Sequence, residues 1–234
     1  MKPRVYLDAA LESPGEVPLD DAPTHHLARV LRLREGDALI VFNGRGGEWD
    51  AEFIGKRRVR LTAFKAIERE SPLRITLVQG VSSGDRMDYT IQKAVELGVA
   101  IVQPLMTRKG VVRLEGARAS ARVEHWKKIA IAACEQCGRN RIPEVLPLTD
   151  FRDYRPSGEG SRLLLSAEGE SIREMKMGSG ATIAAGPEAG FAPDEQAALE
   201  RAGFAKASLG PRVLRTETAA LAALAALNAL RGDF

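Results

Sequence analysis

The chain has 234 residues, of which 44% are hydrophobic and 28% are charged. This length is large for one compact domain and fits two, and the composition is that of a protein with buried cores and a charged surface. No apolar run approaches the roughly 20 residues that cross a bilayer, and residues 1–6 lack the apolar segment of a signal peptide. These features exclude a membrane span and a secretion signal of the usual kind, and we expect a cytoplasmic protein.

The formal net charge of +3 conceals an uneven distribution along the chain. Residues 71–145 carry 12 basic and 7 acidic side chains, whereas residues 1–70 carry 12 of each. An excess of this size favours a polyanionic partner without proving one, because many soluble proteins are as basic.

The two cysteines, Cys134 and Cys137, form a C-x-x-C motif, which occurs in redox sites and in half of a zinc site. Here the motif lies within a helical pattern, no second Cys/His pair has metal-ligand spacing, and the three histidines are scattered. We therefore expect two reduced thiols and no metal.

Short strands dominate the first 70 residues. Apolar or alternating runs predict strands at residues 4–7, 38–42, 48–54 and 59–64, and residues 20–32 predict a short helix capped by Asp21 or Thr24. Several short strands at this spacing are typical of a small barrel.

After a polar linker at residues 68–72 the pattern changes to strands that alternate with helices. Such alternation predicts a mostly parallel α/β sheet, so we place the barrel domain at residues 1–70 and the α/β domain at residues 73–234. The predicted strands are residues 74–81, 101–105, 145–148, 163–166, 181–185 and 207–209, and the predicted helices include residues 85–97 and 120–137.

Two Gly-Pro loops follow buried strands in the last fifty residues. Residues 186–191 read Gly-Pro-Glu-Ala-Gly-Phe, and residues 209–219 read Leu-Gly-Pro-Arg-Val-Leu-Arg-Thr-Glu-Thr-Ala and continue into an alanine-rich helix. Parallel sheets bind ligands beyond the carboxyl ends of their strands, and glycine lets the backbone approach a ligand closely. Each loop taken alone is better explained as a strand-to-helix turn.

The polar cluster at residues 215–218 is the best candidate for catalysis, because it stands at a helix start beside the second loop. Glu217 could serve as a base, or it could simply be stabilised in the first turn by the helix dipole. Thr216 or Thr218 could cap the helix. For Arg215 we expect a ligand-facing role. The chain contains no G-x-G-x-x-G after the first strand and no P-loop motif.

Basic side chains in several segments predict a surface that contacts phosphate groups. For some of them a simpler explanation exists, such as the surface ion pair that Lys93 can form with Glu96 three residues later. The candidate phosphate contacts are Arg29, Arg32, Arg86, Lys93, Arg108, Arg139 and Arg141.

Together, these motifs resemble the ribosomal RNA small subunit methyltransferase E family. The resemblance rests on the two C-terminal loops, on Gln-Lys-Ala-x-Glu-Leu-Gly at residues 92–98, on Glu-Gln-x-x-Arg-x-x-Ile-Pro at residues 135–143, and on the segment at residues 26–32. One position departs from the family pattern, since Ala189 stands where the family has glycine. A methyl group there is compatible with negative φ, so we expect subtle reshaping of the loop and retained binding.

The resemblance implies a SPOUT α/β-knot domain, with a deep C-terminal trefoil knot, preceded by a PUA-like β-barrel that binds RNA. It also implies a homodimer that methylates N3 of a uridine in 16S rRNA of the small ribosomal subunit, with S-adenosylmethionine as cofactor. The positive sulfonium activates the methyl group, so no metal is expected.

Carried onto this chain, the resemblance also implies the site residues. Arg215 and Glu217 would be catalytic, with Glu217 removing the N3 proton and Arg215 stabilising charge on a uracil carbonyl. The cofactor would contact Leu165, Ser166, Ala167, Gly186, Pro187, Glu188, Gly190, Leu209, Gly210, Val213, Leu214 and Thr218.

Two other functions stay open at this point. The chain could be a non-catalytic RNA-binding or ribosome-assembly module, or a SPOUT methyltransferase that acts on another RNA.

Overall fold

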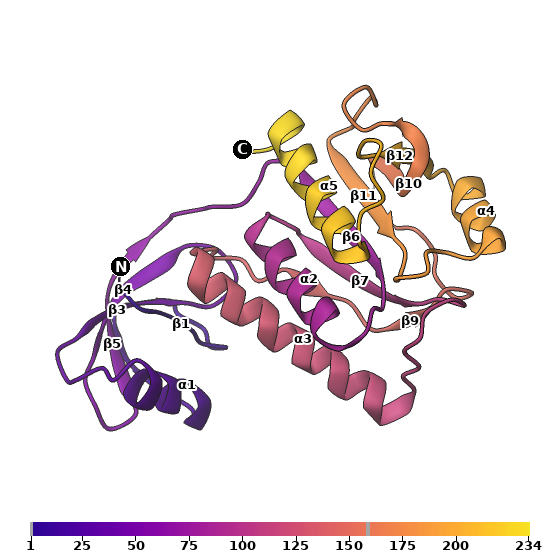
Figure 1. Ribbon diagram of the computed structural model, residues 1–234. Coiled ribbons are helices and arrows are strands. Elements are labelled where there is room, and N and C mark those ends of the chain that lie inside the picture. Colours follow the sequence, from indigo (N-terminus) through magenta and orange to yellow (C-terminus); the bar gives the residue numbers. More distant parts are fainter. Residues whose placement is uncertain (1, 158–159) are drawn as a thin grey trace. The chain divides into compact units, whose positions relative to one another are not determined.

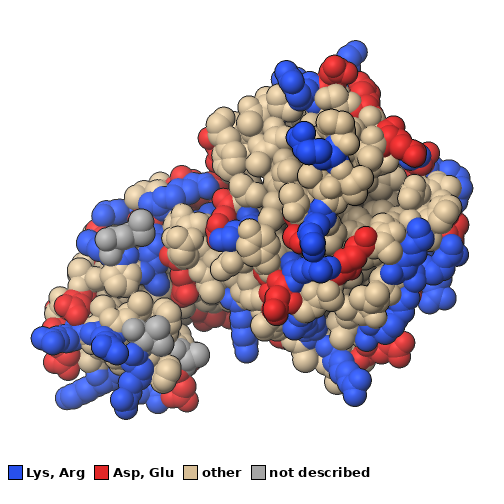
Figure 2. Space-filling view, viewed as in Figure 1, with Lys and Arg blue, Asp and Glu red and all other residues tan. Residues whose placement is uncertain are grey.

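The computed structural model describes residues 2–157 and 160–234 and divides into two compact units (Figure 1). The N-terminal unit comprises residues 1–70 together with residues 131–142, and the C-terminal unit comprises residues 71–130 and 143–234. Lys, Arg, Asp and Glu side chains are spread over the surface of both units (Figure 2).

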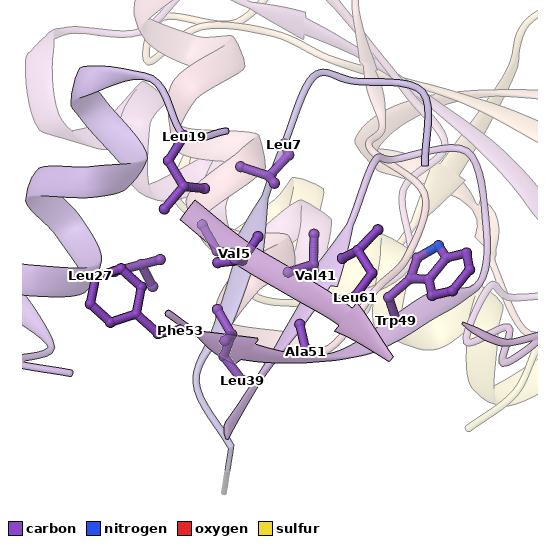
Figure 3. Close-up of a cluster of buried hydrophobic side chains, with 11 residues drawn as sticks. Val5, Leu7, Leu19, Leu27, Leu39, Val41, Trp49, Ala51, Phe53 and Leu61 are labelled. Carbon is purple, nitrogen blue, oxygen red and sulfur yellow. The ribbon is translucent and has the colours of Figure 1, made fainter. Parts of the chain in front are cut away.

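The N-terminal unit is a five-stranded, mainly antiparallel sheet in the order β1-β3-β4-β5-β2. Alternate residues of its strands point inward, and they form one core with Trp49, Phe53 and Leu27, seen in Figure 3. The predicted helix at residues 20–32 is shorter and irregular, and the prediction missed β2. The elements are β1 (Arg4–Tyr6), β2 (Gly15–Pro18), α1 (Asp21–His25), the π-helical turn η1 (His26–Val30), β3 (Ala38–Phe42), β4 (Glu48–Phe53) and β5 (Arg58–Lys65).

A buried ion-pair network ties the strands of this unit to residues 139 and 140. Glu48 accepts hydrogen bonds from Arg4 at 2.6 Å and from Arg69 at 2.9 Å, and Arg4 also donates to the side-chain oxygen of Asn140 at 2.6 Å. Burial by itself would raise the pKa of Glu48, but the hydrogen bonds from Arg69 and Arg4 outweigh burial and lower it to about 2. Glu48 is therefore ionised at neutral pH.

Residues 131–142 belong to the N-terminal unit although they lie more than 60 residues beyond its last strand. Gly46 donates its backbone N–H to Asn140, Ile142 donates to Gly44, and Arg45 forms an antiparallel bridge with Arg141. Main-chain hydrogen bonds thus attach this distant segment to the loop between β3 and β4.

The C-terminal unit is built on a seven-stranded sheet in the order β12-β10-β11-β6-β7-β8, with β9 also paired to β7, and every strand pair in the described part of this sheet is parallel. The strands are apolar on both faces, as a sheet covered by helices requires. They are β6 (Arg74–Gly80), β7 (Ile101–Met106), β8 (Glu144–Val145), β9 (Thr149–Asp150), β10 (Ser161–Ser171), β11 (Gly180–Ala185) and β12 (Ala205–Ser208).

The helices of this part of the chain are α2 (Gly84–Glu96), α3 (Gly116–Cys137), α4 (Pro193–Arg201) and α5 (Thr216–Arg231). The last helix, α5, packs against α2 and against β11 and β6 in the middle of the sheet, although β12, which precedes α5, is at the sheet edge (Figure 1). The chain therefore returns from the edge to the centre after residue 208.

Most predicted elements of the α/β part are present, and their observed ends differ from the predicted ends by a few residues. The helix predicted at residues 120–137 begins at Gly116, and the strand predicted at residues 163–166 extends to Ser171. The prediction missed α4 and β9. Helix α4 begins with Pro193, and the side chain of Glu195 caps it by accepting the backbone N–H of Ala192 at 2.8 Å.

Both cysteines are free thiols. Cys134 is fully buried, and burial raises the pKa of its thiol to about 12. Among residues 2–157 and 160–234, no group of three or more His, Cys, Asp and Glu side chains is placed to hold a metal ion. In the same ranges no helix combines the length and the apolar character needed to cross a membrane.

Candidate active site

A bulge within β10 and the loops that follow β11 and β12 enclose two adjoining cavities. One cavity, of about 440 Å³, is lined by the loop after β11 and the start of α5. The other, of about 130 Å³, is lined by residues 165–167 of β10 and by the loop after β12. Leu165, Val213, Leu214 and Ala219 line both cavities, so the two form one continuous site with apolar walls.

Close backbone contacts explain the glycines of the first Gly-Pro loop. A Cβ atom on Gly186 would lie 2.8 Å from the backbone nitrogen of Phe191, and one on Gly80, at the end of β6, would lie 2.5 Å from Cδ of Pro187. Gly190 takes a φ of +68°, whereas Ala189 is not among the described residues with positive φ. The glycine that the loop conformation demands is therefore present, and the alanine occupies a position that tolerates a side chain.

Strand β10 leaves its register beside the second cavity. Both Leu165 and Glu170 are paired with Ala207 of β12, so residues 166–169 bulge out between them. A Cβ atom on Gly169 would lie 2.5 Å from the backbone nitrogen of Ala207, which fixes the bulge tightly against β12. This bulge places Ser166 and Ala167 on the wall of the cavity.

A buried glutamine connects the strand, the first loop and the last helix. Gln79 of β6, which is fully buried, donates to the hydroxyl of Thr216 at 2.9 Å, and that hydroxyl donates to the carbonyl oxygen of Gly186 at 2.5 Å. The start of α5 is thereby fixed against the loop after β11. The sequence analysis assigned no role to Gln79, although an amide within the apolar strand 74–81 was a visible signal.

Glu188 is held by the start of α2. Its carboxylate accepts the backbone N–H and the hydroxyl of Ser83, both at 3.0 Å, and a guanidinium N–H of Arg86 at 3.2 Å. Burial would raise the pKa of Glu188, but these hydrogen bonds lower it on balance. Glu188 is an anion at neutral pH, and Arg86 becomes part of the cavity wall.

Arg215 and Glu217 both line the larger cavity. The Oε2 atom of Glu217 is buried and has no hydrogen-bond partner within the described part of the chain. Buried carboxylate oxygens normally have a partner, so an unpartnered one on a cavity wall is typical of an atom that meets a ligand. The guanidinium of Arg215 is exposed at the same wall.

The structure brings together all the predicted cofactor contacts except one. Thr218 is exposed in the first turn of α5 and lines neither cavity. The predicted contacts that line the cavities are Leu165, Ser166, Ala167, Gly186, Pro187, Glu188, Gly190, Leu209, Gly210, Val213 and Leu214.

The predicted RNA contacts have varied surroundings. Arg29 and Arg32 are exposed in the N-terminal unit, whereas Arg139 is only 5% exposed and pairs with Glu70, which gives it a part in the packing of that unit. The remaining ones sit at the surface in ion pairs, which are Arg86 with Glu188, Lys93 with Glu96, Arg108 with Asp194, and Arg141 with Glu68.

The sequence of the chain matches two family descriptions. Residues 69–228 match an RNA methyltransferase domain and residues 19–64 match an RNA methyltransferase PUA domain. The ribosomal RNA small subunit methyltransferase E of Buchnera aphidicola (from Acyrthosiphon pisum) is 34% identical, in a match that covers 99% of this chain and 95% of the relative. The chain belongs to the ribosomal RNA small subunit methyltransferase E family. The prediction of an RNA methyltransferase with a PUA domain is confirmed.

Solved structures agree with this assignment. A ribosomal RNA small subunit methyltransferase E from Neisseria gonorrhoeae, bound to S-adenosylmethionine, superposes with a TM-score of 0.92 at 40% identity, and the match covers both chains completely. A Legionella pneumophila protein solved in complex with the same cofactor gives a TM-score of 0.93 at 35% identity, again over both full chains. The predicted fold class, a mostly parallel α/β domain preceded by a PUA domain, is therefore confirmed.

Proposed function

We propose that the chain transfers a methyl group from S-adenosylmethionine to N3 of a specific uridine in the 16S rRNA of the small ribosomal subunit. The observation that carries this proposal is the continuous cavity formed by the bulge of β10 and the two Gly-Pro loops. Its wall includes the exposed Arg215 and a carboxylate oxygen of Glu217 that has no partner within the described chain. The name of the relatives supports a small-subunit rRNA substrate, and the cofactor bound in two similar structures supports the donor.

The cavity suits a nucleoside with a charged tail. Its apolar walls at Leu165 and Leu214 can enclose a purine, and backbone groups in glycine loops can read its polar edge. A Cβ on Gly186 would push the loop apart, so this glycine preserves the shape of the cradle. When bound, S-adenosylmethionine supplies a methyl group made electrophilic by the sulfonium charge.

We assign the removal of the N3 proton to Glu217. Uracil N3 holds its proton at neutral pH. The bond from nitrogen to the methyl carbon forms as the bond from that carbon to the sulfonium sulfur breaks, which leaves a neutral thioether, and the N3 proton must leave for a base. The buried Oε2 of Glu217 can accept it, and the guanidinium of Arg215 can stabilise the negative charge that develops on a uracil carbonyl.

Further parts of the proposal concern the assembly. We propose that the chain acts in the cytoplasm as a homodimer, and that its return from β12 to the sheet centre forms the trefoil knot of SPOUT enzymes. The exposed Arg29, Arg32 and Arg86 are our leading candidates for contacts with rRNA phosphates.

Mass mapping of small-subunit rRNA tests the proposal. Small subunits from cells that lack the gene are incubated with the purified protein and labelled S-adenosylmethionine, and the modified nucleoside is identified after digestion. We expect one 3-methyluridine in 16S rRNA. Total transfer RNA from the same cells is incubated in parallel. Label in the transfer RNA and none in the subunits would point to another RNA substrate, and cofactor binding without any transfer would point to a non-catalytic module.

A further inference from the structure

Another cavity of the C-terminal unit has a lining separate from that of the proposed cofactor site. It has a volume of about 920 Å³, and it is formed by the carboxyl end of β7, the turn after β9, and helix α4. None of its lining residues lines the two cavities described above. At the right of Figure 2, where Figure 1 places α4 and β9, several Lys and Arg side chains lie together.

The rim of this cavity carries five arginines, and three of them form no ion pair within the described residues. The backbone carbonyl groups of residues 107, 108 and 112 accept hydrogen bonds from Arg113, and those of residues 152 and 154 accept from one nitrogen of Arg155. Arg201, at the end of α4, is exposed. Carbonyl contacts orient a guanidinium without neutralising it, so these groups keep their charge for an anion.

The carboxylates at the same rim are mostly engaged by two of its arginines or by the backbone. Asp194 pairs with Arg108, and Asp150 pairs with Arg152, whose hydrogen bonds lower the pKa of Asp150. The buried Glu195 caps its own helix and accepts the backbone N–H of residue 108 at 2.7 Å. Glu115 is the remaining acid of the lining, so positive charge prevails at the rim.

The floor of the cavity is apolar and has one unsatisfied polar group. Phe151, Tyr154 and Leu199 line it and pack on the core of the unit. Thr107, which is 4% exposed, also lines it, and its buried hydroxyl has no hydrogen-bond partner in the described chain. Aromatic side chains, a hydroxyl and a charged rim are what a nucleotide requires for its base, its polar edge and its phosphate.

The floor is also directly connected to the first Gly-Pro loop. The ring of Phe151 lies 5.9 Å from that of Phe191, and Phe191 follows Gly190 in the loop that lines the cofactor cavity. A ligand on this floor would therefore bind close to the loop at which the methyl group is transferred.

We propose that this cavity holds a second nucleotide of the RNA substrate, one that is not methylated, with its phosphate at Arg155 and Arg201 and its base over Phe151 and Tyr154. The inference rests on the proposed RNA substrate and adds a place where that RNA is held. It makes these arginines positioning residues for the RNA, distinct from the groups at the methyl-transfer site.

Steady-state methylation of small subunits by the Arg155→Ala/Arg201→Ala double variant tests the proposal. We expect KM for the subunits to rise about tenfold with kcat nearly unchanged. The slope of log affinity for 16S rRNA against log salt concentration should become shallower by about 0.7 for each phosphate that the variant no longer binds. Arg173→Ala, an exposed arginine outside all these cavities, is the matched control and should leave both quantities unchanged. An unchanged KM in the double variant overturns the inference, whereas no methylation by the wild-type protein overturns the proposed function instead.

Photo-crosslinking identifies what occupies the floor. With a 16S rRNA transcript that contains 4-thiouridine, we expect adducts on the peptide that includes residues 151–155, and their absence would contradict the proposal. A free nucleotide has the same base and phosphate and is the alternative occupant of this cavity. Micromolar binding of uridine monophosphate, abolished in the double variant while rRNA binding persists, would assign the cavity to a free nucleotide and overturn the RNA assignment.

Discussion

Two carboxylates with buried oxygens, one in each unit of this protein, have opposite surroundings. In the N-terminal unit Glu48 accepts from two arginines, and each terminal nitrogen of Arg4 has an acceptor. In the C-terminal unit, Oε2 of Glu217 is buried on a cavity wall with no partner in the described chain. Paired buried charges fix how the segments of a fold pack together. An unpaired buried acceptor lowers stability, so its presence is best explained by a ligand that it binds. For these two carboxylates, hydrogen-bond partners rather than burial distinguish the one in the scaffold from the one on the cavity wall.

The largest effect expected from this comparison is on catalysis. Glu217→Gln keeps the size of the side chain but removes a basic oxygen, so we expect methyl transfer to fall by about 10²–10⁴-fold, the usual contribution of a general base. Cofactor affinity, measured by isothermal titration with S-adenosylmethionine, should remain within a few-fold. Normal turnover in this variant would show that Glu217 is not the base.

Breaking the paired network of the N-terminal unit is expected to lower stability and not catalysis. Arg4→Ala leaves Glu48 buried without one of its two partners, so we expect the free energy of unfolding to fall by about 3–5 kcal/mol. Chemical denaturation measures this change. The conservative variant Arg4→Lys, which keeps the charge but not the forked geometry, should destabilise the protein less, and an equal effect in both would argue that packing alone is at stake.

Acid should weaken the N-terminal unit for the same reason. Because the folded-state pKa of Glu48 is lowered from 4.5 to about 2, its contribution to stability is fully present above pH 4.5 and disappears as the pH falls towards 2. Thermal unfolding measured between pH 6 and pH 2.5 should show this decline, and Glu48→Gln should flatten the profile in that window. A profile of unchanged steepness in the variant would contradict the role given to this carboxylate.

The smallest effect is expected at the loop position that departs from the family pattern. Ala189→Gly removes a methyl group from a residue that does not take positive φ, so we expect cofactor affinity to change by about twofold or less. Gly190→Ala is the informative partner, because its φ of +68° disfavours a side chain, and cofactor affinity should fall clearly. Isothermal titration measures both.

Much of the fold was readable from the sequence because its local signals agree with its tertiary structure. The alternation of apolar strands and amphipathic helices indicated the parallel sheet, and the Gly-Pro loops indicated the edge at which the structure has two adjoining cavities. Helix α4 was missed because its first residues, Pro193 and Asp194, resemble a continuing loop. The two-residue strand β9 was missed because it is defined only by its partner β7.

The site was partly predictable for the same physical reason. Glycines at a strand end indicate close backbone approach, and they placed the loops correctly. The link from Gln79 through Thr216 to Gly186 joins residues that are up to 137 positions apart in sequence, so no local pattern could reveal it. The bulge at residues 166–169 depends on the register with β12, which the strand's own sequence does not encode.

The attachment of residues 131–142 to the N-terminal unit has a consequence for synthesis on the ribosome. A nascent chain that has emerged only as far as residue 70 has all five strands of the barrel but lacks Asn140, the acceptor for Arg4, and the main-chain partners of Gly44 and Gly46. Domains generally fold in order as they emerge. Here the first unit cannot be completed until the first half of the second has been translated, so a stop between them yields an unfinished barrel.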